Sequence, residues 1–316
     1  MTIAEDAKER AEHRIDIAAP PSVVYGLVAD VTQWPVIFSP TVHVEVLERS
    51  SSTERLRLWA LANGEVRTWI SRRWLNPEAQ RIEFRQEICS PPVAAMGGTW
   101  TIHPAADGGS HIVLGHDYSA VGGDPAAISW IAAAVDRNSQ AELAALREAA
   151  ELGQQLDELS TDFEDSVEIA GDAQTVFEFL YQAQLWPERL PHVSALELEQ
   201  DGPDVQRMTM STRAPDGSVH TTESVRARVG DRIVYKQTVT PALLAAHTGT
   251  WTVRAGTNSV IATSAHRVLL RAEAIPEVLG ADATISAARD AVRKALGANS
   301  MTTLQHAKSF AEQRHA

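Results

Sequence analysis

The sequence of 316 residues contains one cysteine, Cys89. A single thiol excludes an internal disulfide and any zinc site that is built on several cysteines. No apolar run approaches the roughly 20 residues that a membrane-spanning helix needs. The first residues, MTIAEDAKERAEHR, are polar and lack the apolar stretch of a secretory signal peptide. These absences predict a cytoplasmic protein with no membrane partner.

Basic residues are also scarce, since 28 Lys and Arg face 41 Asp and Glu and leave a net charge of −13. General nucleic-acid binders usually carry a basic excess, so we expect no nucleic-acid partner. Glycine-rich phosphate loops, G-x-S-x-G and H-E-x-x-H are all missing, and the histidines lack metal-site spacing. We therefore expect neither a cofactor nor a metal.

The second half of the chain repeats the first. Trp34-Pro returns as Trp186-Pro, and Gly-Thr-Trp100-Thr returns as Gly-Thr-Trp251-Thr, in the same order and at nearly the same spacing. The length fits two domains, and a repeat this long exceeds the roughly 20–50 residues of solenoid units. We predict a tandem duplication of one fold, with domains at residues 1–158 and 159–316.

Each copy shows the same order of secondary-structure signals. In the first copy a strand at His13–Ile17 and a short helix at Ser22–Val31 precede segments of period two between residues 43 and 118. A long amphipathic helix follows, from about Pro125 to Glu158. This order predicts an α+β, helix-grip domain, in which a curved antiparallel sheet surrounds a long C-terminal helix. A curved sheet around one helix tends to leave a cavity, which is the default ligand site.

This layout is similar to that of the START/Bet v1-like superfamily. More specific segments resemble the bacterial polyketide aromatase/cyclases, and the tandem arrangement resembles their di-domain class. The resemblance implies an enzyme that closes the first ring of a poly-β-ketone, with C7–C12 regiochemistry, dehydration and aromatisation. It also implies an acyl carrier protein and type II polyketide synthase enzymes as partners. The segments are Trp34-Pro-Val-Ile-Phe-Ser-Pro, Gly64-Glu-Val-Arg-Thr-Trp69-Ile-Ser-Arg72-Arg73 and Gly98-Thr-Trp100-Thr.

The period of a strand places Trp69, Ser71 and Arg73 on one face. If this face lines the cavity, the guanidinium of Arg73 can stabilise the enolate oxygen of an aldol reaction. The corresponding strand arginine is a key pocket residue in the family, so the resemblance supports Arg73. We expect Arg73→Ala to divert the products while stability barely changes. The alternative is a solvated surface arginine.

His116 is the expected proton relay, because histidine titrates near neutral pH. A hydrogen-bonded structural histidine is the alternative. Aromatic and amide side chains are expected to line the cavity and hold the substrate in one pose. Core packing is the alternative for the two tryptophans that recur in the second copy. The expected wall residues are Trp34, Trp69, Trp100, Tyr118 and Asn138.

The second copy keeps Arg226 and His266 where the first has Arg73 and His116, but Thr222 replaces Trp69. Two interpretations remain open. The second domain has a pocket that acts on a later state of the chain, or it is a structural support whose arginine pairs with an acid. Its expected substrate-binding residues are Trp186, Trp251 and Asn299.

A different class of function is possible on the same fold. A non-catalytic protein that binds or transfers hydrophobic small molecules or lipids needs the cavity but not an internal cation. A pure interaction module would have both cavities filled by side chains. The arginine-rich segment from Arg49 to Arg85 either steers an acidic carrier protein or forms an ordinary sheet surface.

Overall fold

The computed structural model describes residues 8–213, 217–257 and 259–315. The chain divides into two compact units, residues 1–154 and 155–316. Each unit has a seven-stranded antiparallel sheet and a long C-terminal helix, so the predicted helix-grip architecture is confirmed. The division predicted between residues 158 and 159 falls within α4 (Gln154–Leu159), near its end.

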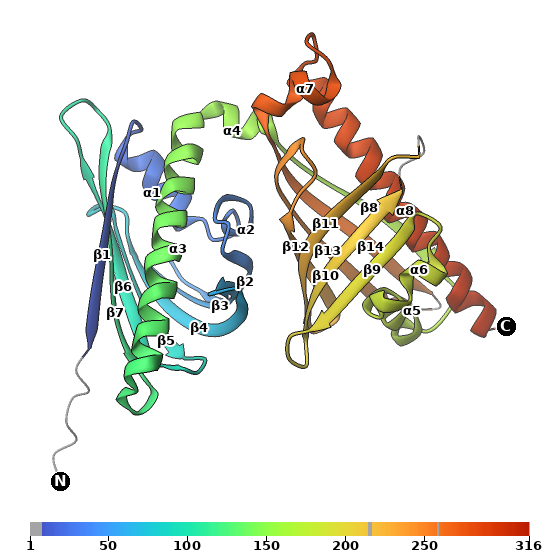
Figure 1. The fold of residues 1–316 in the computed structure, drawn as a ribbon, viewed down its shortest axis with the longest axis horizontal. Helices are drawn as coiled ribbons and strands as arrows, with labels where there is room; N and C mark the ends of the chain where they lie inside the picture. The colour runs from blue at the N-terminus through green and yellow to red at the C-terminus, as the bar shows by residue number, and fades with distance from the viewer. Residues whose placement is uncertain (1–7, 214–216, 258, 316) are drawn as a thin grey trace. The chain divides into compact units, whose positions relative to one another are not determined.

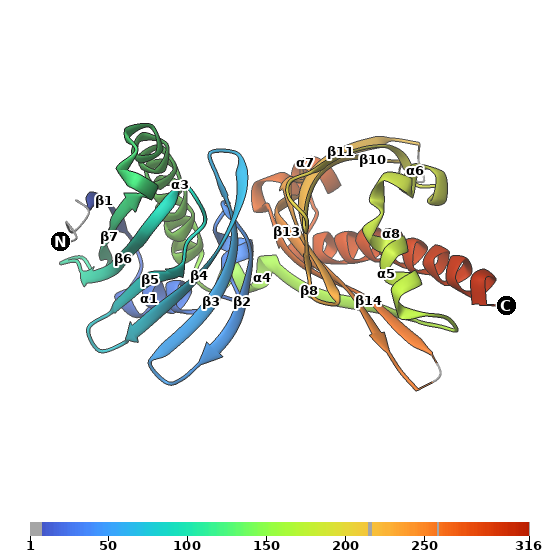
Figure 2. The same ribbon diagram turned by 90° about the horizontal axis from the view of Figure 1, so that it is seen from below.

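The first unit has the strand order β1-β7-β6-β5-β4-β3-β2. The first and last strands of this unit thus pair with each other, and the sheet curves around α3 (Figures 1 and 2). The elements are β1 (Glu9–Ile17), α1 (Pro21–Ala29), α2 (Trp34–Ile37), β2 (Thr41–Arg49), β3 (Thr53–Ala62), β4 (Glu65–Asn76), β5 (Arg81–Ile88), β6 (Val93–Pro104), β7 (Ser110–Ala120), the 3-10 turn η1 (Val121–Gly123), α3 (Pro125–Leu152) and α4 (Gln154–Leu159).

The second unit repeats this order as β8-β14-β13-β12-β11-β10-β9, and its sheet curves around α8 (Figure 2). Its elements are β8 (Ser160–Ile169), α5 (Ala173–Tyr181), η2 (Ala183–Leu185), α6 (Trp186–Arg189), β9 (Val193–Gln200), β10 (Val205–Arg213), β11 (Val219–Val229), β12 (Arg232–Val239), β13 (Leu244–Ala255), β14 (Val260–Leu270), η3 (Ala272–Ala274), α7 (Ile275–Leu279) and α8 (Ile285–His315).

Local sequence sets the ends of these elements. Asp124 caps α3 by accepting hydrogen bonds from the backbone N–H groups of residues 126 and 127. The helix ends at Gly153, whose φ of 54° is costly for other residues, and this interrupts the single helix predicted as far as residue 158. Asn63 and Gly64, with φ of 52° and 84°, make a two-residue hairpin that fixes the β3–β4 register.

Each unit has buried apolar clusters of its own. In the first unit, Ile131 and Val135 of α3 belong to one buried cluster, while Leu56 and Leu58 of β3 belong to another. In the second unit, one buried cluster joins α5, the sheet and α8. Among the described residues, no helix is both long enough and apolar enough to cross a membrane.

Candidate functional site

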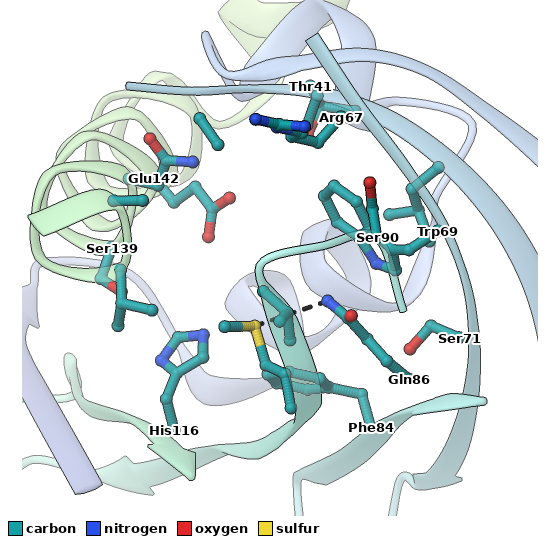
Figure 3. Close-up of a pocket in the computed structure, with 18 of the residues that line it drawn as sticks. Thr41, Arg67, Trp69, Ser71, Phe84, Gln86, Ser90, His116, Ser139 and Glu142 are labelled. Atoms are coloured by element: carbon teal, nitrogen blue, oxygen red, sulfur yellow. Dashed lines mark hydrogen bonds between the residues drawn. The ribbon is translucent and has the colours of Figure 1, made fainter. Parts of the chain in front are cut away.

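A cavity of about 170 Å³ lies between the concave face of the first sheet and α3 (Figure 3). Residues of both of these buried clusters line it, among them Ile131 and Leu56. The predicted residues that line it are Trp34, Trp69, Ser71, Arg73, Trp100, His116 and Asn138.

Tyr118 does not line this cavity, which corrects the prediction for that residue. It lies on β7 two residues beyond His116 and is buried with Ile131 and Val135 where α3 begins. The strand period alone places Tyr118 on the same face as His116. The first turns of α3 cover that end of the face and turn a predicted wall residue into core.

Arg73 is buried, with 2% of its surface exposed. Its Nε donates to Glu54 Oε2 at 2.6 Å, and its Nη atoms donate to the carbonyls of Val28 and Ala29 at the end of α1. The guanidinium also lies over the Trp34 ring, 5.3 Å from its centroid. Burial lowers the pKa of Arg73, while Glu54 acts in the opposite direction. Arg73 thus holds α1 and Trp34 against the sheet with its charge already paired.

Two expectations about Arg73 are therefore wrong. The residue is not a solvated surface arginine, and Arg73→Ala is not a mild substitution. Truncation would remove three hydrogen bonds and part of the counter-charge of buried Glu54. Breaking a buried ion pair in this way costs roughly 3–5 kcal/mol.

Glu142 is the functional candidate that the sequence analysis missed. It lies one turn beyond Asn138 on α3, and its carboxylate points into the cavity (Figure 3). Burial raises the pKa of Glu142 from 4.5 to about 7. A carboxyl with this pKa exists in both protonation states at neutral pH, so it can take up and return a proton. The sequence could have indicated Glu142 through its spacing of four residues from Asn138, because residues i and i+4 lie on the same face of a helix.

His116 lies across the same cavity (Figure 3), and its ring packs edge-on against Phe84 with centroids 5.5 Å apart. Burial is the main cause that lowers its pKa to about 4, so the imidazole is neutral at pH 7. Its Nδ1 is buried and has no hydrogen-bond partner within the described residues. A neutral imidazole facing a carboxyl of raised pKa gives the cavity two groups that can exchange protons with a ligand.

Arg67 and Trp130 also line the cavity and were not predicted. Arg67 precedes Trp69 by two residues on β4, and its guanidinium lies 5.3 Å from the Trp130 ring centroid. Asn138 donates to the carbonyl of Leu61 at 2.8 Å, which ties α3 to β3 beside these residues. The wall thus combines aromatic rings with a few polar groups held in place by backbone contacts.

The arginines on the other face of the sheet are paired with acids. Arg55 and Arg72 both donate to Glu87 at 2.6 Å, and Arg57 donates to Glu45 at 3.1 Å. These contacts neutralise the local basic excess and favour the interpretation as an ordinary sheet surface over a carrier-protein steering patch.

Arg226 makes the same backbone contacts in the second unit as Arg73 makes in the first. Its Nη2 donates to the carbonyl of Leu180 at 2.6 Å, and the guanidinium lies 5.0 Å from the Trp186 ring centroid. The partner at the Glu54 position is Gln206, at 3.1 Å, so the interpretation in which Arg226 pairs with an acid is wrong about that partner. Burial lowers the pKa of Arg226 to about 10. The architecture alone explains why this arginine recurs.

The other second-unit candidates occupy different environments. Trp186 and Trp251 belong to the buried core cluster, with ring centroids 6.5 Å apart. Asn299 is exposed on α8, unlike the half-buried Asn138. His266 is buried among polar side chains. Thr303, three residues after Ser300, stands where the first copy has Glu142 three residues after Ser139. The second copy thus keeps the frame and loses the cavity carboxyl.

Comparison with known proteins matches both copies separately. A family model described as polyketide cyclase / dehydrase and lipid transport covers residues 8–151 and again residues 160–299. The granaticin polyketide synthase bifunctional cyclase/dehydratase of Streptomyces violaceoruber is 44% identical over 314 residues, which is 99% of this chain and 97% of that protein. The corresponding actinorhodin protein of Streptomyces coelicolor is 44% identical over 98% of this chain and 99% of its own.

Solved structures resemble the whole two-unit chain. The di-domain ARO/CYC BexL from the BE-7585A biosynthetic pathway superposes with a TM-score of 0.83 at 50% identity and covers 96% of this chain and 99% of its own. The di-domain ARO/CYC StfQ from the steffimycin pathway superposes with a TM-score of 0.82 at 35% identity over 96% and 99%. The likeness therefore extends over both units.

Proposed function

This chain belongs to the polyketide cyclase/dehydrase and lipid transport family, and we propose that it is a bifunctional aromatase/cyclase of aromatic polyketide biosynthesis. It closes the first ring of a poly-β-ketone, removes water and aromatises that ring. The observation that carries this proposal is the first-domain cavity, where Glu142 with a pKa of about 7 faces neutral His116 between aromatic walls. The full-length similarity to cyclase/dehydratases of two polyketide synthases supports it.

The proposed chemistry uses Glu142 as the first base. Ionised Glu142 removes a proton from a methylene between two ketones, and the resulting enolate carbon bonds to a ketone carbon further along the chain. The new alkoxide oxygen takes a proton from Glu142 or from the N–H of His116. Loss of a second proton from the attacking carbon, together with the hydroxyl, releases one water. Tautomerisation of the remaining ketones then gives an aromatic ring with hydroxyl groups, and no oxidant is needed.

Arg73 serves this reaction as a positioning residue rather than as the electrostatic catalyst that the sequence suggests. Its charge is paired with Glu54, and its hydrogen bonds hold α1 and Trp34 in place. Trp34, Trp69 and Trp100 restrict the poses of a flexible chain, and orientation of this kind can supply several kcal/mol of the barrier. A residual attraction of Arg73 for a substrate carbonyl is weakened by the nearby carboxylate.

A carrier of lipids or other apolar molecules is the alternative that the family description leaves open. Such a protein gains nothing from a carboxyl whose burial disfavours its ionised form. The polar pair in the cavity therefore favours the enzyme. Glu142→Gln separates the two functions, because it preserves the shape of the cavity and removes the base.

The substrate is proposed to be a chain carried by an acyl carrier protein, and the closure to join C7 and C12, as the resemblance to di-domain enzymes implies. Reconstitution with a minimal type II synthase and its carrier protein, with and without a ketoreductase, tests both points. We expect a product with one C7–C12 aromatic ring only when the protein is added. Identical product mixtures with and without it would contradict the proposed function.

A further inference from the structure

A polar cluster occupies the concave face of the second sheet, apart from the site described above. Cross-strand pairing places Tyr235 and Gln237 of β12 on the same face as His247 of β13 and His266 of β14. His266 Nδ1 lies 3.1 Å from the Tyr235 hydroxyl oxygen and 3.0 Å from His247 Nε2. The corresponding first-domain positions hold Phe84 and Met96 in place of Tyr235 and His247, so this cluster belongs to the second copy alone.

The fold makes room for this cluster. Gly249 pairs with Tyr235 across the sheet, and a Cβ at Gly249 would lie 2.3 Å from the Tyr235 hydroxyl oxygen. On the far side of His266, its Nε2 lies 3.1 Å from the hydroxyl of Ser264. Tyr235 and His266 are thus held from several strands in one arrangement.

The cluster leaves two of its polar atoms unsatisfied. His247 Nδ1 and Gln237 Oε1 are buried without a hydrogen-bond partner among the residues that the structure describes. Burial lowers the pKa of His247 to about 3 and that of His266 to about 4, so both rings are neutral at pH 7. Buried polar atoms are nearly always paired in proteins, because an unpaired one loses its hydrogen bonds to water without replacement. Two such atoms on neighbouring strands therefore point to a missing partner.

Several side chains on this face are not fully buried. Tyr235, Met210 and Met301 pack against the core cluster and yet stay partly exposed, as does Gln237. Thr222 stands where the first domain has Trp69, which removes an indole from this wall. Met210 and Met301 offer a ligand apolar contact surface. A fitting ligand therefore has an apolar body and a small polar group that reaches Gln237 and His247.

We propose that the second domain carries a separate binding site for a phenol or an enol. A hydroxyl has one hydrogen and two lone pairs, so it can donate to Gln237 Oε1 and accept from His247 Nδ1–H at the same time. A ketone oxygen only accepts and would leave Gln237 Oε1 unsatisfied. Arg226, which pairs across the sheet with Tyr235 and has the neutral partner Gln206, favours the partial negative charge of a phenol oxygen. Phenols are what ring closure in the first domain yields, so the identity of the natural ligand rests on the proposed function.

Binding of 2-naphthol and of 2-methoxynaphthalene to the full chain, measured by calorimetry, tests the site. The two probes differ only in the hydroxyl hydrogen that the methyl group replaces. We expect 2-naphthol to bind at least tenfold more tightly, because a site built for a hydroxyl discriminates strongly against analogues without it. Gln237→Leu and His247→Phe should each remove this preference. Gln86→Leu, the matched change at the equivalent first-domain position, should leave it intact.

Equal affinity for the two probes would overturn the proposal, as would an undiminished preference in Gln237→Leu. A crystal structure at saturating 2-naphthol that shows only an ordered water between Gln237 and His247 would also overturn it. If Gln237→Leu does not fold, Gln237→Met, with a similar volume, replaces it. These assays use no polyketide, so a failure of ring closure in the reconstituted synthase would reject the proposed function and leave the site standing.

Discussion

Replacement of Glu142 by Gln should stabilise the protein at high pH while it abolishes the proposed reaction. The folded state raises the pKa of Glu142 from 4.5 to about 7. One pKa unit corresponds to about 1.4 kcal/mol, so the whole change amounts to roughly 3 kcal/mol. Because the carboxyl keeps some exposure to the cavity, we expect a gain between about 1 and 3 kcal/mol in Glu142→Gln at pH 8.

The sign of this effect follows from proton linkage. Between pH 4.5 and about 7 the folded state binds more protons at Glu142 than the unfolded state does, so its contribution to stability falls as pH rises through that range. Above about pH 7 the full cost of the buried charge remains. Glu142→Gln removes this cost, so its advantage over wild type should be near zero at pH 4.5 and largest at pH 8.

Urea unfolding at pH 4.5 and pH 8, followed by tryptophan fluorescence, measures this difference. Six of the eight tryptophans lie in the first domain, so the signal reports mainly on the domain that contains Glu142. Glu148→Gln is the matched control, since Glu148 is an exposed carboxyl on the same helix. An equal stability difference between Glu142→Gln and wild type at both pH values would refute the assignment of a buried, perturbed carboxyl.

Further predictions concern the arginines, the histidines and Gly249. Arg73→Ala should lower the free energy of unfolding by roughly 3–5 kcal/mol. Arg72→Ala, at its partly exposed neighbour, should cost at most about 1 kcal/mol, and equal urea midpoints of the two variants would contradict the positioning role. Burial lowers the pKa of His247 to about 3, so below pH 6.5 the unfolded state binds more protons at this residue than the folded state does. The free energy of unfolding should therefore fall as pH drops towards 4. His247→Phe should weaken this pH dependence, and an unchanged slope would contradict the low pKa of His247. Gly249→Ala should destabilise the second domain by about 1–3 kcal/mol through its contact with Tyr235, and an unaltered thermal midpoint would show that the ring shifts freely.

Much of the fold was available from the sequence because it depends on local patterns. The repeated Trp-Pro and Gly-Thr-Trp-Thr segments identify two copies, and the period of two identifies the strands. The Asn63-Gly64 hairpin even fixes the register that pairs Glu54 with Arg73, since two-residue turns set strand pairing. The sequence thus contained the information that Glu54 faces Arg73. An arginine paired with a carboxylate is a positioning residue rather than a free cation.

Features that depend on how helices pack against the sheets could not be predicted from the sequence. Which face of α3 meets the cavity depends on how the helix rotates against the sheet, so Glu142 was missed while its neighbour Asn138 was predicted. Tyr118 shares a strand face with His116, but the start of α3 covers only the former. The exposure of Asn299 likewise reflects the packing of α8 and not its spacing from any motif.

The products formed by Glu142→Gln in a reconstituted synthase show whether Glu142 is the base of ring closure and aromatisation. Wild type, Glu142→Gln and Glu148→Gln would each be combined with a minimal synthase and its carrier protein, and the products identified by mass spectrometry and NMR. We expect an aromatised first ring with wild type and Glu148→Gln, and spontaneously cyclised by-products with a folded Glu142→Gln. The same aromatised product at the same rate from Glu142→Gln would contradict it.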